Sequence, residues 1–177
     1  AEEEPVPGGT LTLFPGSSEP PSYHNAMQAD ASVVRAHLTP LYDSLIVLDF
    51  ETNEVVPRLA ESVESNDAGT EWTITLRDTE FSDGTPFDAA AVVANWDYMA
   101  DPANASRCMS VVDSWQSYEA VDERTVVVTL AEPRGGFLWQ LANTCVTLIA
   151  SPTALEEHGE DFGSSPETTV AAGPFTL

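Results

Sequence analysis

The segment of residues 71–77 constrains the fold more than any other part of the chain, because its side chains alternate between apolar and polar. Trp72, Ile74 and Leu76 would lie on one side of an extended strand, while the threonines between them and Arg77 would lie on the other. This period of two is typical of a strand that is buried on one face only. The segment is the clearest strand in the sequence.

A helix is predicted shortly after this strand. Residues 81–87 form a tight turn with phenylalanine at both ends, and Asp88 then stands where a helix N-cap is expected. Apolar residues recur from there at helical spacing and give the helix one apolar face; they are Val92, Val93, Trp96 and Met99. The helix should end near Asp101-Pro102. The strand and the helix together indicate a mixed α/β fold.

The remaining segments continue this mixture. Strands are predicted at 10–14, 46–49, 111–121 and 125–130, the last two joined as a hairpin through 122–124, and residues 146–149 are β-like. Helical pieces are predicted between Asp30 and Leu45, split at Pro40, then near Phe137, and from Ser151-Pro152 to Gly159. Residues 173–177 resemble the opening of a further strand, so we expect the chain to be a fragment.

Composition excludes several classes of function. The 177 residues contain 29 acidic and 6 basic side chains, and all 6 basic ones are arginine, so the net charge is −23. Without lysine there is no ordinary P-loop, Schiff-base nucleophile or Ser–Lys dyad. So acidic a chain repels nucleic acid, which is therefore not an expected partner. No apolar run approaches the roughly 20 residues that span a bilayer, so no transmembrane segment is predicted.

No catalytic or metal-binding motif is present. The three histidines lack the spacing of a zinc site, and there is no Gly-x-Ser-x-Gly elbow, so neither a catalytic residue, a metal site nor a cofactor is predicted. Trp72 and Trp96 fit core-facing patterns, whereas Trp115 and Trp139 stay undecided between core and cleft. The two cysteines also leave two alternatives open. They form one disulfide if the protein is exported, or are unrelated buried thiols if it is cytosolic.

Several ordered motifs resemble one family. They are Gly8 to Leu13 before a Pro/Ser loop, Leu41 to Asp49 (LYDSLIVLD), Val56 to Ser62 (VPRLAES), Glu71 to Ala89 with its FSDGTPFDA block, and Gly173-Pro174-Phe175. In this order they resemble the family 5 extracellular solute-binding proteins, the peptide- and nickel-type receptors of ABC importers. The resemblance spans Gly8 to Leu177, with Val63 in place of the family's usual tryptophan. Family members run to about three times this length.

The resemblance implies the N-terminal part of a periplasmic-binding-protein type II-like lobe with the family's extra α/β subdomain. The expected division is a flexible leader at 1–9, a first-lobe strand and cleft loop at 10–39, the extra subdomain at 40–168, and a return strand at 169–177. The second lobe, which would form the other wall of the cleft, is absent from this sequence.

The resemblance also implies the ligand contacts. The loop after the first strand would supply Tyr23, His24, Asn25, Met27 and Arg35, and the subdomain would add Met109, Asn143 and Thr144. An arginine in a cleft pairs bidentately with a carboxylate, which suits a peptide or an acidic ligand. Cys108 and Cys145 fall in the two cleft-side segments of the subdomain, and their apposition there favours a disulfide.

The function implied is that of a non-enzymatic, extracytoplasmic receptor. It would capture a peptide or another small polar solute and deliver it to ABC permease subunits, either in the periplasm or as a cell-surface lipoprotein with a lipid anchor upstream of residue 1. One alternative is a nickel or metal-chelate carrier of the same family that uses His24, Met27 and His37. A secreted hydrolase is disfavoured by the missing nucleophile motif. From the high acidic charge we derive the hypothesis that the protein works in a salty habitat.

Overall fold

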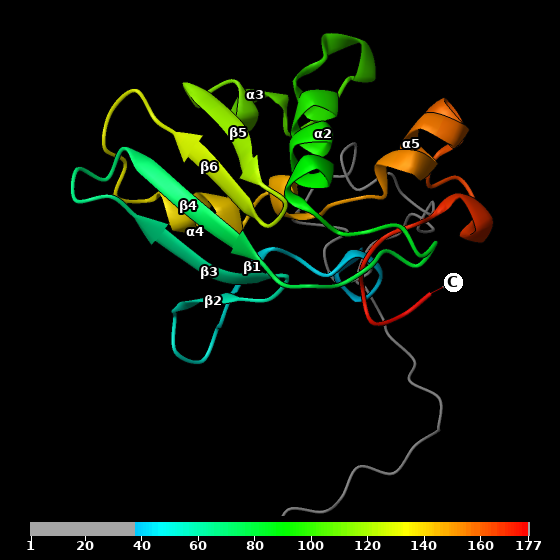
Figure 1. Ribbon diagram of the computed structural model, residues 1–177, viewed down its shortest axis with the longest axis horizontal. Coiled ribbons are helices and arrows are strands. Elements are labelled where there is room, and N and C mark those ends of the chain that lie inside the picture. Colours follow the sequence, from blue (N-terminus) through cyan, green and yellow to red (C-terminus); the bar gives the residue numbers. More distant parts are fainter. Residues whose placement is uncertain (1–37, 177) are drawn as a thin grey trace, which may run out of the picture.

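The computed structural model describes residues 38–176. The predicted strand at 10–14 and the start of the helical segment after Asp30 lie outside this range. Residues 38–42 are helical on both sides of Pro40, so the predicted split at Pro40 is not seen. The described part is a mixed α/β structure in which helices pack against one four-stranded sheet (Figure 1). This confirms the expected fold class.

The sheet has the strand order β3-β4-β6-β5 and is antiparallel throughout. Its strands are β3 (Ala60–Ser65), β4 (Glu71–Leu76), β5 (Ser117–Asp122) and β6 (Thr125–Thr129). β4 is the predicted alternating strand, and β5 and β6 form the predicted hairpin. No strand was predicted for β3, nor for β2 (Val55–Pro57), which pairs with β1 (Ile46–Leu48) in a separate small hairpin.

One face of the sheet carries the core. Trp72 lies opposite Val128 on β6, and Val128 lies opposite Tyr118 on β5, so these side chains share a face. Helix α2 (Ala89–Ala100) covers this face through Trp96, whose ring centroid lies 5.4 Å from that of Tyr118. Helix α4 (Phe137–Ala142) covers it through Phe137, 5.1 Å from the Trp72 ring. The other face of β4 carries threonines that are only half-buried.

Helix α2 follows the sequence prediction closely. The Asp88 carboxylate caps it by accepting a hydrogen bond from the Ala91 amide at 2.7 Å. A cap of this kind satisfies one of the amide groups that the first turn leaves unpaired. Val92, Trp96 and Met99 are fully buried, as their spacing predicts.

One predicted strand is wrong in its first half, and the β-like segment at 146–149 is not a strand. The start of the predicted strand at 111–121 lies in the short helix α3 (Met109–Val112), and only Ser117 onward is extended. Residues Cys145–Thr147 form the 3₁₀ turn η2 instead of a strand. Both stretches are short and contain β-branched residues, and such runs do not distinguish a strand from a turn. Both also lie at the cysteine pair, and the tertiary bridge there outweighs local β propensity.

The last described residues pack against the first ones. The Gly173 amide donates to the Leu41 carbonyl at 2.8 Å, and the Phe175 amide donates to the Pro40 carbonyl at 3.2 Å. A Cβ at residue 173 would overlap the Leu41 carbonyl group, so this crossing requires glycine. Residues 173–176 form no assigned strand, and the nearest bridge joins Ala171 to Ala150.

Helix α5 (Pro152–His158) is the last α-helix of the described residues. Ser151 caps its first turn and Gly159 follows its last, as predicted. Three further 3₁₀ turns are η1 (Pro102–Asn104), η3 (Gly159–Asp161) and η4 (Pro166–Thr168). Of the tryptophans that the sequence left undecided, Trp115 is buried in the core and Trp139 is 49% exposed.

Candidate functional site

The two cysteines form a disulfide between the start of α3 and the 3₁₀ turn η2. Cys108 and Cys145 are bonded, with their Cα atoms 6.0 Å apart, and both are buried. The pairing expected from the family resemblance is therefore confirmed. Because the bridge joins residues that lie 37 positions apart, it fixes the two expected cleft-side segments next to each other.

Three of the predicted ligand contacts lie at this bridge, which we call the disulfide edge: Met109, Asn143 and Thr144. Met109 directly follows Cys108 and is half-buried. Asn143 ends helix α4 and is exposed, and the half-buried Thr144 directly precedes Cys145. The other five predicted contacts lie outside the described residues; they are Tyr23, His24, Asn25, Met27 and Arg35. The three predicted contacts that the structure describes therefore all lie next to the disulfide.

Backbone contacts orient both polar side chains at the disulfide edge. The Asn143 Nδ2 donates to the Trp139 carbonyl at 2.9 Å, and the Thr144 Oγ1 donates to the Gln140 carbonyl at 2.9 Å. Within residues 38–176 no donor reaches the Asn143 Oδ1, so this oxygen can accept a hydrogen bond from a bound solute. The edge therefore offers neutral hydrogen-bonding groups beside a flexible thioether.

Trp139 is an exposed aromatic residue in the middle of α4, four residues before Asn143. Phe137 and Leu141, which flank it at helical spacing, face the core and are buried. This i, i+4 pair identifies the buried side of α4 and places Trp139 away from it. The sequence contains this i, i+4 spacing, but a helix of six residues is too short for the spacing alone to show whether Trp139 is buried or exposed.

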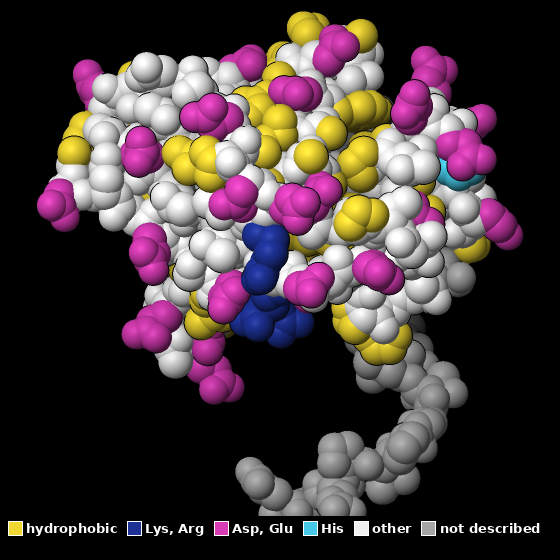
Figure 2. All heavy atoms as spheres, viewed as in Figure 1, with side chains coloured by type: hydrophobic (Ala, Val, Ile, Leu, Met, Phe, Trp, Pro, Cys, Tyr) yellow, Lys and Arg dark blue, Asp and Glu magenta, His cyan; other side chains and the backbone are white. Residues whose placement is uncertain are grey.

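A second concentration of functional groups was not predicted from the sequence. It is an open hollow of about 460 Å³ beside the ends of β2 and β4, and we call it the charged hollow. Its charged lining residues are Asp43, Arg58, Arg77, Asp78 and Glu80, and residues 172–174 close one side. The basic side chains visible in Figure 2 gather in one patch, whereas acidic side chains are spread over the face.

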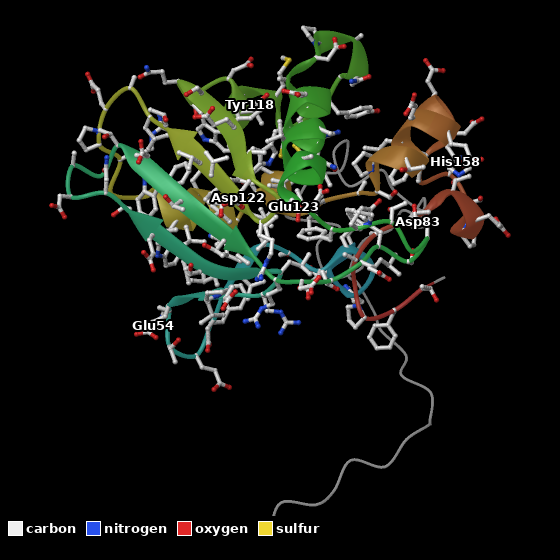
Figure 3. All side chains as sticks on the ribbon, viewed as in Figure 1. Glu54, Asp83, Tyr118, Asp122, Glu123 and His158 are labelled. Atoms are coloured by element: carbon white, nitrogen blue, oxygen red, sulfur yellow. A yellow bond between two sulfur atoms is a disulfide. The ribbon has the colours of Figure 1, made fainter. Side chains whose placement is uncertain are left out.

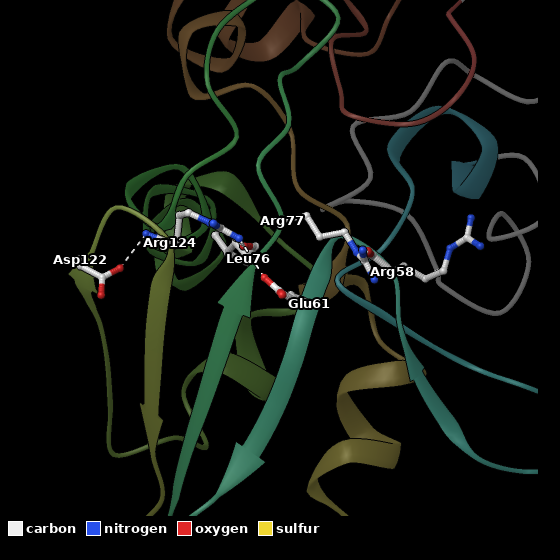
Figure 4. Close-up of polar contacts among 6 residues, drawn as sticks. All are labelled: Arg58, Glu61, Leu76, Arg77, Asp122 and Arg124. Atoms are coloured by element: carbon white, nitrogen blue, oxygen red, sulfur yellow. Dashed lines mark hydrogen bonds and ion pairs between the residues drawn. The ribbon is translucent and has the colours of Figure 1, made fainter.

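Arginine side chains at the strand ends are held by backbone carbonyl groups. The Arg77 Nε donates to the Arg58 carbonyl at 2.6 Å, and Arg124 donates twice to the Leu76 carbonyl (Figure 4). Arg124 also pairs with Glu61 at 3.0 Å, and Figure 4 shows Glu61 between Arg124 and Arg58. The positions of these guanidinium groups therefore follow from the sheet, and sequence spacing alone could not bring them together.

An acidic side chain connects the turn before α2 to the start of α5 (Figure 3). Asp83 accepts hydrogen bonds from the hydroxyl groups of Ser151 and Thr85, each at 2.6 Å. Burial acts to raise the pKa of Asp83, but the hydrogen bonds from Ser151 and Thr85 outweigh it and hold the pKa below its usual value. Ser151 is fully buried and also caps α5, so this network serves the fold.

Neither a metal-binding cluster nor a membrane-spanning helix occurs in the described part of the chain. Among residues 38–176, no three His, Cys, Asp or Glu side chains are grouped so that they could hold a metal ion. The same residues contain no helix that is both long and apolar enough to cross a membrane.

Comparison with known proteins places most of the chain in one family. Residues 54–177 match the model of the bacterial extracellular solute-binding proteins, family 5 Middle. A curated relative, the glutathione-binding protein GsiB of Shigella flexneri, is 37% identical over 150 residues, which cover 84% of this chain and 28% of the relative.

Solved structures show the same fold. An oligopeptide ABC transporter substrate-binding domain from Bacillus anthracis superposes with a TM-score of 0.76 at 24% identity, over 86% of this chain and 32% of that one. NikZ from Campylobacter jejuni, in complex with Ni(L-His), superposes with a TM-score of 0.70 at 23% identity, over 90% and 31% of the two chains. The chain thus spans about a third of the length of the proteins it matches.

Proposed function

Because this chain belongs to the family 5 bacterial extracellular solute-binding proteins, we propose that it forms part of the substrate-binding component of an ABC importer. The match of residues 54–177 to the family model carries this proposal. The receptor captures a peptide or a similar small polar solute outside the cytoplasm and presents it to permease subunits. It acts without catalysing a reaction.

The proposed architecture divides the receptor into two lobes. Residues 10–39 and 169–177 belong to the first lobe, residues 40–168 form its extra subdomain, and residues 1–9 are a leader. A second lobe, outside this sequence, supplies the other wall of the binding cleft. Capture then proceeds by hinge closure, because a ligand that contacts both walls favours the closed state.

The proposed ligand class follows from the groups at the disulfide edge. Asn143 offers a carbonyl oxygen that can accept a hydrogen bond, while Met109 provides an adaptable apolar contact. Peptides present both amide donors and apolar side chains, so they suit such an edge. In this proposal Arg35 pairs with a ligand carboxylate. The names of the glutathione-binding and oligopeptide-transporter relatives support the same class of ligand.

The proposed location is the periplasm or the outer cell surface, with a lipid anchor upstream of residue 1 in the second case. The disulfide supports this location, because such bonds persist in oxidising compartments and are rare in the cytosol. The family description names the proteins as extracellular.

Isothermal titration of the full-length protein tests the proposed ligand class. We expect heat of binding with dipeptides and none with the nickel–histidine chelate. Replacement of Asn143 by Ala should weaken dipeptide binding by about fivefold, the usual effect of losing one hydrogen bond. Gln116→Ala is the matched control, because it removes an exposed amide outside the disulfide edge. Heat with the chelate alone would contradict the peptide proposal and favour the metal-chelate carrier.

A further inference from the structure

The charged hollow is lined by opposite charges, of which only Arg58 and Asp43 pair with each other. Arg58 and Arg77 contribute guanidinium groups, and Asp78 and Glu80 contribute carboxylates. Among the described residues, Asp78 and Glu80 have no side-chain hydrogen bond, and the nearest ion pair of Arg58 is with Asp43 instead. Apart from the Arg58–Asp43 pair, the charged side chains that border this space therefore do not pair with one another.

Both guanidinium groups are positioned through their ε nitrogens. The Arg58 Nε lies 3.3 Å from the Asp43 carboxylate, and the Arg77 Nε donates to the Arg58 carbonyl. The terminal Nη1 and Nη2 atoms of both residues have no partner within 38–176. An arginine held in this way keeps the donors that match a carboxylate in a bidentate geometry.

The net charge of the chain favours a zwitterion over a simple anion as the ligand of this hollow. A simple anion is repelled by a protein of charge −23, and the carboxylates of Asp78 and Glu80 add to that repulsion locally. A zwitterion has no net charge and uses both signs of the lining. A hollow of about 460 Å³ also lies within the usual size of a small-molecule site, about 300–1,000 Å³.

We propose that the charged hollow binds a small zwitterion, an amino acid or a dipeptide, with its carboxylate at Arg58 and Arg77 and its ammonium group at Asp78 and Glu80. The Arg58 side chain is 50% exposed, so solvent weakens these contacts and the binding is weak. The site shares no residue with the disulfide edge. The proposal of this site therefore does not depend on the proposed transport function.

Arginine side-chain NMR signals of the 177-residue chain provide a direct test, because six arginines and no lysine give few signals. We expect glycylglycine to shift the Hε–Nε signals of Arg58 and Arg77 in a saturable manner. The signal of Arg134 should not move, since its side chain is bonded to Ser114 and Gln140 elsewhere. Unmoved Arg58 and Arg77 signals up to the solubility limit of the dipeptide overturn the proposal.

Two further measurements distinguish a zwitterion site from a site that binds a single charge. Asp78→Asn should weaken glycylglycine binding several-fold, whereas Asp67→Asn, an equal charge change on the exposed β3–β4 turn, should leave it unchanged. Acetate and ethylamine each carry only one of the two charges, so both should shift the arginine signals far less than glycylglycine does. Equal shifts with acetate, or equal effects of the two variants, refute the assignment of Asp78 to the ammonium group.

Discussion

Asp83 makes the clearest contribution to stability that a single residue offers. Its carboxylate accepts hydrogen bonds from Ser151 and Thr85, and its pKa is lowered in the folded protein. A lowered folded pKa means that this stabilisation is present above the unfolded pKa of about 4 and is lost as the pH falls through the folded value. The contact between the turn before α2 and helix α5 should therefore become less stable as the pH falls into the acid range.

Replacement of Asp83 by Asn should lower the free energy of unfolding at pH 7 by about 1 kcal/mol, the low end for hydrogen bonds to a charged group, because the side chain is largely exposed. The difference from the wild-type protein should shrink below about pH 4, where the wild-type carboxylate also becomes protonated. Urea unfolding at both pH values measures this. Asp67→Asn, which removes an exposed carboxylate without a hydrogen bond to any described residue, is the control, and an equal loss of stability in both variants would contradict the assignment.

At the scale of elements, the disulfide holds the short helix α3 against the turn that follows α4. Neither segment is long enough to be stable alone, since α3 has four residues and η2 has three. A bridge across 37 positions removes unfolded-state entropy equivalent to about 3 to 4 kcal/mol. The disulfide edge therefore depends on the bridge for its geometry.

Loss of this disulfide should lower the melting temperature strongly. We expect the Cys108→Ala, Cys145→Ala double variant to lose about 3 to 4 kcal/mol of unfolding free energy in urea titrations, and the reduced wild-type protein to behave alike. Intact mass should be two hydrogens smaller before reduction than after it, because the bridge removes one hydrogen per thiol. Two thiols open to alkylation in unreduced, denatured protein would show that the bridge does not form.

The elements also show what local sequence can and cannot predict. Strand β4 and helix α2 were predicted because alternation and a capped apolar stripe are short-range signals. Residues 111–116 and 146–149 were misassigned because the bridge and the packing around it, not propensity, decide their conformation. The charged hollow was missed for a related reason, since its residues come from separate strand ends that only the sheet register brings together.

At the scale of the whole molecule, acidic charge is distributed while basic charge is concentrated. Acidic side chains cover the visible face, and few basic ones accompany them (Figure 2). With 6 arginines for 29 acidic side chains, ion pairs such as Arg58–Asp43 and Arg124–Glu61 leave most carboxylates without a cation. The compact state therefore carries self-repulsion that the unfolded chain, with its charges further apart, largely avoids.

Added salt should consequently raise the melting temperature of this chain. Screening shortens the Debye length from about 30 Å at 0.01 M to about 10 Å at 0.1 M and about 3 Å at 1 M, so repulsion between neighbouring surface carboxylates weakens progressively over this range. Differential scanning calorimetry in sodium chloride and in potassium chloride at equal ionic strength should give the same rise, because screening does not depend on the identity of the cation. A flat or falling melting temperature would show that self-repulsion does not limit stability, and a rise confined to one cation would indicate specific ion binding instead.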